Sequence, residues 1–279
     1  MIWGYQNGWF PEFLEAGLSK LWGKLHFLQR YGFKDTTVDI EELLELAPEE
    51  RDRVAAYLSE HDLHIQPSVW YDYVNSDDRV AQDAHEALVE GLAALVQPMR
   101  STVVFTKAGC GHRFDGSLPV DEKLSRLSSR LAPLATACKS LGAPLAINNQ
   151  GDFYIGDFCE LADRTDELYL WIDTANIFWA GEPIFPAFER AAERTLATHW
   201  RDEKVVPGNK KPRGVLLENC VTGHGDVNLP RCYQTLLERA PDPDNLVMEI
   251  ELFPPRGMDK TQALHEAIVF CREQTGGEM

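Results

Sequence analysis

Four side chains of the kinds that bind metal ions or move protons recur in the second half of the sequence. They are Asn148, Asp173, His199 and Glu249, and they are separated by 25, 26 and 50 residues. Each stands at or near the end of a short apolar run that is otherwise suited to burial. Oxygen ligands together with one imidazole suit Mn²⁺, Mg²⁺, Co²⁺ or Zn²⁺. The four residues therefore predict a divalent metal site, if the fold brings them together.

Short apolar or β-branched runs alternate with longer amphipathic runs along the whole chain, which indicates repeated strand and helix pairs. Eight runs have strand character: Ile2–Tyr5, Thr36–Asp39, Leu63–Val69, Thr102–Lys107, Pro144–Asn148, Leu168–Asp173, Leu196–Trp200 and Leu246–Leu252. Eight such pairs in 279 residues predict an α/β fold, a closed (β/α)₈ TIM barrel that forms a single domain over residues 1–279. A doubly wound sheet fits less well, because no GxGxxG follows the first strand.

In such a barrel the carboxyl ends of all strands face one mouth, so the four polar side chains are expected to converge there. Taken singly, three of them have a more common structural role. Asp173 would cap a turn, His199 would be a hydrogen-bonded core histidine, and Glu249 would pair with an arginine. Their joint occurrence at successive strand ends favours the metal site.

The ordered strand ends also resemble those of the xylose isomerase-like barrel superfamily of sugar-phosphate isomerases and epimerases. The matching segments are INNQGD from Ile147, IDTAN from Ile172, THWRD from Thr198, GHGDVNLP from Gly223 and VMEIE from Val247. The resemblance implies a divalent metal and a sugar or other polyhydroxy carbonyl substrate, with proton transfer through an enediolate. It also makes a homo-oligomer an expectation by analogy.

The sequence departs from this family at Asn148, where the family has a metal-binding glutamate, and at Gln150, where it has a histidine. An amide oxygen can bind a cation, but an amide is neither an acid nor a base near neutral pH. Epimerisation by two bases is therefore not expected. A one-base isomerisation or a β-elimination by a dehydratase or lyase is more consistent, although the family's dehydratases generally keep the glutamate as well.

Glu249 and His224 are the candidates for proton transfer. His224 stands between two glycines in the loop before the seventh helix, where an exposed histidine without a catalytic role is the more common case. Glu251 shares a strand face with Glu249 and would reach the mouth if the strand were extended. The more common alternative is a solvated glutamate paired with Arg256.

Candidate substrate-binding residues lie at or just beyond the strand ends. They are expected to bind hydroxyl, carboxylate or phosphate groups, or to cover an apolar sugar face: Trp9, Gln66, Lys107, His112, Asn176, Arg201 and Lys204. The segment 201–228 is the longest irregular stretch, and we expect it to form a wall of the active site.

The net charge and the cysteines indicate which partners and which cellular compartment to expect. A formal net charge of −17 argues against nucleic acid and membrane surfaces as partners. Six scattered cysteines without a CxxC pair suit a reducing compartment, and no targeting or membrane segment is recognisable, so a cytoplasmic location is expected. A nuclease of the endonuclease IV type is disfavoured by this charge and by Asn176 at a histidine position. A catalytically impaired barrel that binds a small molecule or serves as an accessory subunit is a further alternative.

Overall fold

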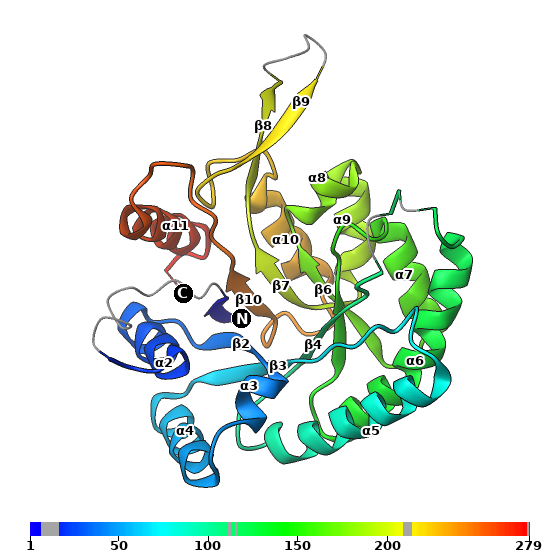
Figure 1. Cartoon of the computed structure of the whole chain (residues 1–279). Coiled ribbons are helices and arrows are strands. Elements are labelled where there is room, and N and C mark those ends of the chain that lie inside the picture. The colour runs from blue at the N-terminus through cyan, green and yellow to red at the C-terminus, as the bar shows by residue number, and fades with distance from the viewer. Residues whose placement is uncertain (7–16, 111–112, 115, 209–213, 278) are drawn as a thin grey trace.

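The computed structural model describes residues 1–6, 17–110, 113, 114, 116–208, 214–277 and 279 (Figure 1). Its parallel strands close into a barrel in the order β1-β10-β7-β6-β5-β4-β3-β2. Their bounds are β1 Ile2–Tyr5, β2 Asp35–Asp39, β3 His64–Ser68, β4 Val104–Lys107, β5 Leu145–Asn148, β6 Leu168–Asp173, β7 Thr195–Trp200 and β10 Val247–Ile250. All eight expected strands are present, and the predicted (β/α)₈ barrel is confirmed.

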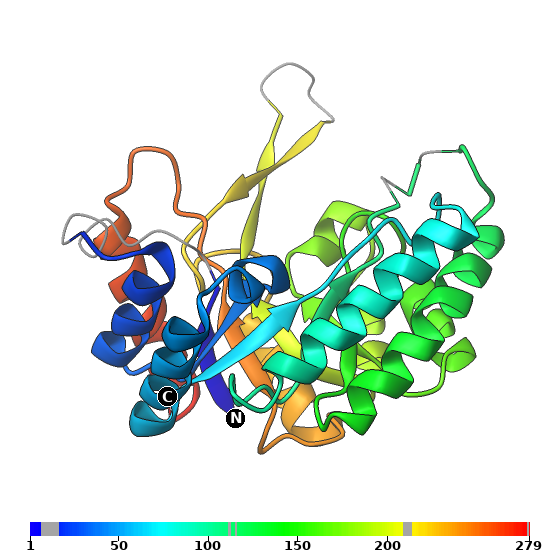
Figure 2. The same ribbon diagram turned by 60° about the horizontal axis from the view of Figure 1, so that its bottom comes forward.

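Helices surround the ring of strands, as Figures 1 and 2 show. They are α2 Lys20–Tyr31, α3 Ile40–Leu44, α4 Pro48–His61, α5 Asp78–Leu95, α6 Val120–Ser140, α7 Ile155–Arg164, α8 Asn176–Ala180, α9 Ile184–Ala192, α10 Leu229–Arg239 and α11 Lys260–Gln274. Side-chain caps fix several starts: Asp77 accepts the N–H of Val80 at α5, and Asp259 accepts that of Gln262 at α11. None of the helices in the described ranges combines the length and apolar character needed to cross a membrane.

Two apolar layers stabilise the barrel. The larger one lies between the strands and the helices. The smaller one fills the inside of the ring and consists of Val103, Phe105, Ala146, Trp171, Ala197 and Val247. Because these side chains pack the interior, the barrel is a solid scaffold rather than a pore. The polar groups at the mouth therefore lie above a layer of closely packed apolar side chains.

The segment 201–228, expected to be irregular, contains a β-hairpin. Strand β8 (Glu203–Pro207) pairs antiparallel with β9 (Val215–Asn219), and the hairpin projects from the barrel (Figures 1 and 2). Every residue of β9 is exposed. Apart from Glu203 at the start of β8, none of the residues in these two strands is buried, so the strands lack the alternation of apolar and polar residues that marks a half-buried strand in a sequence. The expectation of an irregular segment was therefore wrong.

Candidate metal centre and its cavity

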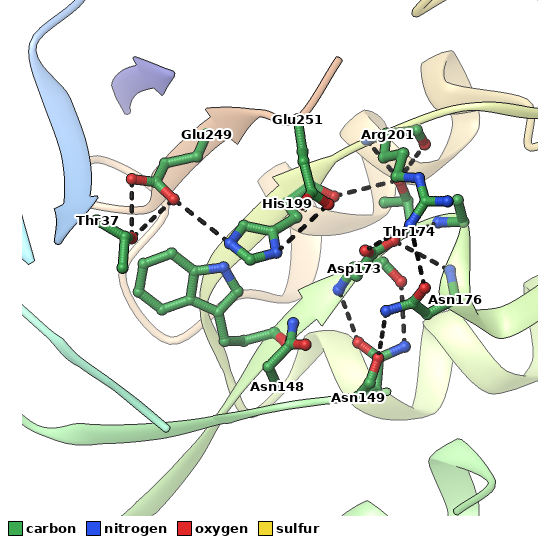
Figure 3. A network of polar contacts seen from close by, with 12 residues as sticks. Thr37, Asn148, Asn149, Asp173, Thr174, Asn176, His199, Arg201, Glu249 and Glu251 are labelled. Carbon is green, nitrogen blue, oxygen red and sulfur yellow. Dashed lines mark hydrogen bonds and ion pairs between the residues drawn. The ribbon is translucent and has the colours of Figure 1, made fainter. Parts of the chain in front are cut away.

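Three ligand-type side chains meet at the mouth of the barrel (Figure 3). Asp173 ends β6, His199 lies in β7 and Glu251 follows β10. Each offers one ligand atom, and these atoms lie within 4.8 Å of one another. Neighbouring strands place them together, because Asp173 pairs with His199 and His199 with Glu249 in the parallel register. Two carboxylates and one imidazole at this spacing can hold a divalent cation.

Asp173 is held in place by its own turn and by a neighbouring amide. Its Oδ1 accepts the N–H groups of Ala175 at 2.9 Å and Asn176 at 3.0 Å. The side chain of Asn149 bonds the backbone of Asp173 twice, accepting its N–H at 2.6 Å and donating to its carbonyl at 3.1 Å. Asp173 thus caps the turn with one oxygen, while Oδ2 faces Arg201 at 3.4 Å. The turn-capping role and a ligand role are compatible.

His199 is buried between two aromatic rings. Phe105 stacks on the imidazole at a centroid distance of 5.5 Å, and Trp171 contacts it edge-on at 5.4 Å. Its Nδ1 lies 3.8 Å from Glu251, and its Nε2 lies 3.4 Å from Glu249. Burial lowers the pKa of His199, but the carboxylates of Glu251, Glu249 and Asp173 outweigh it and raise the pKa above its ordinary value.

Glu249, expected to be a ligand and a proton-transfer group, lies on the other side of this imidazole. It is completely buried, and the Thr37 hydroxyl lies 2.9 and 2.8 Å from its two oxygens. Gly4 makes room for it, because a Cβ there would lie 2.9 Å from Cγ of Glu249. Residues 249 and 251 share a strand face, and only the second reaches the Nδ1 side of His199. In the described residues, the group that could hold a metal ion therefore contains Glu251 and not the predicted Glu249. We call Asp173, His199 and Glu251 the ligand group.

Glu251 is mostly buried, so the expectation of a solvated glutamate paired with an arginine was wrong. Its side chain is 14% exposed, and its ion-pair partner is His199 rather than Arg256. Burial raises the pKa of Glu251 to about 7, with Asp173 adding to the rise and His199 and Arg201 opposing it. Such an acid is neutralised easily when no cation is bound.

Asn148 lies beside the group and is 1% exposed. Its Nδ2 donates to the carbonyl of Trp171 at 3.0 Å. This bond directs the amide nitrogen toward the backbone of β6, so the amide oxygen is the atom that a cation could use. Asn148 lines the same cavity as Asp173, His199 and Glu251.

The cavity above the group has a volume of about 830 Å³, and three predicted substrate-binding residues line it: Lys107, Asn176 and Arg201. The guanidinium of Arg201 donates to Glu203 at 2.6 Å, to Asn176 at 3.3 Å and to Asp173 at 3.4 Å. The rings of Trp179 and Phe253 each lie 4.7 Å from its central carbon. Burial opposes the charge of Arg201, but Asp173, Glu251 and Glu203 raise its pKa above the ordinary value. The fixed guanidinium can orient hydroxyl or carboxylate groups.

Two other predicted residues lie away from this cavity. Gln66 is completely buried, donates to Asp35 at 2.5 Å and accepts the backbone N–H groups of Thr102 and Val103. It holds strands together rather than facing the mouth. Lys204 is exposed on β8 of the hairpin. Trp9 and His112 lie outside the described residues.

His224 also lies away from the cavity. Its side chain is 59% exposed, and its nearest acidic partner is Glu266 at 3.8 Å. The sequence of the loop that carries His224 is explained by its hydrogen bonds to Asp202. The carboxylate of Asp202 accepts the backbone N–H groups of Gly223, Gly225 and Val227, so the GHGDV segment wraps around that side chain. The structure does not support His224 as the proton-transfer group.

Several cavity residues were not singled out from the sequence, and Lys24 of α2 is the most informative. The helix reads as an ordinary amphipathic segment, in which a lysine is expected on the solvent side. Yet Lys24 lies three residues after Leu21 and four before Leu28, which are both buried. This spacing places Lys24 on the same face of the helix as the two leucines, and it could have been recognised in the sequence.

Comparison with known proteins agrees with this architecture. The family model described as xylose isomerase-like TIM barrel matches residues 25–274. A D-psicose 3-epimerase from Clostridium cellulolyticum H10 aligns with a TM-score of 0.75 at 11% identity, covering 99% of each chain. The IOLI protein with a bound zinc atom aligns with a TM-score of 0.72 at 15% identity, covering 100% of this chain and 99% of its own.

A probable 3-DHS dehydratase from Bacillus anthracis is similar to the same extent. It aligns with a TM-score of 0.71 at 15% identity, covering 97% of this chain and 98% of its own. Identities this low show the fold alone. No curated protein sequence matches the chain.

Proposed function

The chain belongs to the xylose isomerase-like TIM barrel family, and we propose that it is a divalent-metal-dependent enzyme that isomerises or epimerises a sugar or other polyhydroxy carbonyl compound by proton transfer. The observation that carries the proposal is the group formed by Asp173, His199 and Glu251 at the floor of a cavity of about 830 Å³. A cavity of this size accommodates a sugar-sized molecule.

The donor set fits a divalent cation. Asp173 and Glu251 supply carboxylate oxygens, and His199 supplies Nδ1, with Glu249 on the Nε2 side to favour the tautomer that leaves Nδ1 free. Asn148 can add an amide oxygen. When bound, Mn²⁺, Mg²⁺, Co²⁺ or Zn²⁺ would polarise a carbonyl or hydroxyl oxygen and stabilise negative charge on it. The zinc in the IOLI protein supports this assignment by analogy.

The residues around the group have separate roles in the proposal. Arg201 and Asn176 are already fixed by mutual bonding and would orient hydroxyl groups of the substrate. Lys107 approaches from β4 and lies over the ring of Trp70 at 5.1 Å. Asn148 cannot exchange a proton, so the chemistry uses one base rather than two. A polyol or sugar-like substrate and a homo-oligomer belong to the same proposal.

A dehydratase or lyase is the second candidate function. It is favoured by Asn148, because elimination needs proton removal from one face only, and by the likeness to a probable 3-DHS dehydratase. Both candidates share the cation and the first proton transfer. A barrel that binds a small molecule without turnover is the outcome if neither reaction occurs.

Metal analysis of the purified protein tests the proposal directly. We expect about one divalent ion per chain, removable by a chelator, with a melting temperature that falls on removal and recovers on addition of Mn²⁺, Co²⁺ or Zn²⁺. Asp173→Asn and His199→Ala should lose the ion while keeping the barrel, and Lys204→Met on the hairpin is the control. Metal-free protein that no divalent ion stabilises would refute the proposal.

A further inference from the structure

A lysine lies buried at the edge of the cavity. Lys24 of α2 is 6% exposed and lines the same cavity as Asp173, His199 and Glu251. Its Nζ donates to the backbone carbonyl of Thr37 at 2.7 Å. Lysine is among the side chains least often buried without a counter-ion, because removing its charge from water costs several kcal/mol.

Within the described ranges, Nζ of Lys24 has no carboxylate at ion-pair distance. The charged groups that face it from a longer distance are Lys20 on its own helix, Glu42 on α3, Asp35 on β2 and Glu249 on β10. Burial lowers the pKa of Lys24 to about 8, against the opposing effect of Glu249. A substantial fraction of the amine is therefore neutral in weakly basic solution.

Lys24 is connected to the ligand group by contacts through Thr37 and Glu249. The carbonyl of Thr37 accepts its bond, the hydroxyl of Thr37 contacts Glu249, and Glu249 faces His199. Lys24 thus belongs to the β2 side of the mouth, while the ligand group belongs to the side of β6, β7 and β10. Lys24 and the ligand group therefore line one cavity from different sides.

Other groups in the cavity that could act as a base are exposed or already engaged. Asp39 is exposed, and Nζ of Lys107 lies over the ring of Trp70 at 5.1 Å. Asp173 and Glu251 are candidate ligands, and Glu42 is paired with Lys20 at 3.0 Å. Asp152 accepts the backbone N–H of Cys110 at 3.1 Å. Asn148 occupies the position at which a carboxylate would be expected, and it cannot transfer a proton.

We propose that Lys24 is the proton-transfer residue of this site and takes over the task that a carboxylate at position 148 would perform. The proposal rests on the proposed function. The neutral amine removes the proton from the carbon next to the substrate carbonyl. An N–H bond forms, the C–H electrons become a carbon–carbon double bond, and the carbonyl electron pair moves to oxygen.

The reaction is completed without any other reactant. In an isomerisation the ammonium returns a proton to the former carbonyl carbon, and the hydroxyl proton passes between the two oxygens of the enediol. In an elimination the enolate oxygen re-forms the carbonyl, and the electrons of the enolate double bond form a new double bond to the next carbon. The hydroxyl group on that carbon leaves as water with a proton supplied by the ammonium. Lys24 ends each cycle in its starting state.

The test measures exchange of carbon-bound hydrogen for deuterium. Dihydroxyacetone, D-fructose and D-tagatose are incubated in D₂O with the Mn²⁺-loaded protein, and the loss of proton signals is followed by NMR. We expect exchange by the wild type, increasing as pH rises through about 8. Lys24→Met and Lys24→Arg should both lose it by about 100-fold or more, because neither side chain accepts a proton in this range.

The Lys24→Arg variant distinguishes a role of Lys24 in proton transfer from a role of its positive charge. It keeps the positive charge and the hydrogen-bond donors, so a purely structural or anion-binding lysine would tolerate it. Lys34→Met, on an exposed lysine paired with Asp62, is the matched control and should exchange like the wild type. Melting temperatures and bound Mn²⁺ confirm that each variant is folded and loaded.

The outcomes distinguish the two proposals. If the wild type exchanges, His199→Ala does not, and Lys24→Arg keeps its rate within a few-fold, the metal-dependent function stands and the role of Lys24 is refuted. If the loaded wild type exchanges none of the three compounds, both proposals fail. Exchange that is insensitive to pH between 7 and 9, a range that spans the amine's pKa of about 8, would also refute Lys24 as the base.

Discussion

The two ring nitrogens of His199 face two glutamates, one in β10 and one just after it: Nε2 lies 3.4 Å from Glu249, and Nδ1 lies 3.8 Å from Glu251. The imidazole thereby separates a buried carboxylate from one at the mouth. Glu249 can fix the ring and its tautomer, while Glu251 shares the ligand space with Asp173. Under the proposed function, these two glutamates therefore have different tasks.

Substitution of each glutamate should distinguish these tasks. Glu251→Gln removes a charged ligand, and we expect it to abolish stoichiometric metal retention. Glu249→Gln keeps a hydrogen-bond acceptor next to Nε2, so metal affinity should fall by only about 10- to 100-fold. Competition with a chromophoric chelator measures both affinities. A larger loss for Glu249→Gln than for Glu251→Gln would show that the ligand is Glu249.

Metal affinity should increase with pH. The pKa of Glu251 is raised to about 7 and that of His199 is raised above its ordinary value, and both groups must lose protons to bind a cation. Affinity measured by titration calorimetry is expected to rise between about pH 5 and 7 and then level off. An affinity independent of pH over this range would mean that neither group binds the ion.

The raised pKa of Glu251 also predicts how the stability of the metal-free protein depends on pH. The folded state holds the Glu251 proton up to about pH 7, whereas an unfolded glutamate loses it near 4.5. Because the folded state binds more protons, this group contributes stability below that lower value, and the contribution disappears as pH rises to about 7. Glu251→Gln should flatten this part of a urea-denaturation profile, and an unchanged slope would contradict the raised pKa.

Asn148→Glu tests whether this side chain reaches the cation. The added carboxylate should tighten metal binding by about 10-fold or more. The metal-free protein should lose about 1–3 kcal/mol, because the carbonyl of Trp171 loses its donor and faces a negative charge. Asn148→Ala also removes the donor but adds no carboxylate, and it should not tighten binding. Equal metal affinity for the glutamate variant and the wild type would place residue 148 outside the coordination sphere.

The barrel was predictable because its signals are local and repeated. Each strand is an apolar run of a few residues between amphipathic helices, and this alternation over 279 residues leaves little choice of fold. Asp173 and His199 were located by the same logic, since each stands at or next to the end of a run. The hairpin β8–β9 was missed because its strands are not half-buried and carry no comparable pattern.

The choice between Glu249 and Glu251 could not be made from the sequence. Side chains two apart on a strand share a face, so the pattern admits both. The decision depends on how far the imidazole of His199 extends and on the room that Gly4 leaves beside Glu249. Lys24 was missed for a related reason, because the helical pattern reports a shared face but not which side chains on it line a cavity.

Arg201 provides the last prediction, which concerns stability rather than binding. Its guanidinium donates to Glu203 at 2.6 Å, and both side chains are buried. Removing one partner of a buried pair leaves the other charge without compensation. Arg201→Met should therefore lower the free energy of unfolding by about 3–5 kcal/mol, as measured by urea denaturation of the metal-free protein.

A second substitution shows whether this loss comes from the stranded charge. Arg201→Met combined with Glu203→Gln removes the nearer of the two carboxylate charges, Glu203 and Asp173, that the single variant leaves behind, so a large part of the lost stability should return. Arg231→Met, which breaks the exposed pair with Glu189, is the control and should cost about 1 kcal/mol or less. If the double variant is as unstable as the sum of its single substitutions, the packing of Arg201 between Trp179 and Phe253 matters more than its charge.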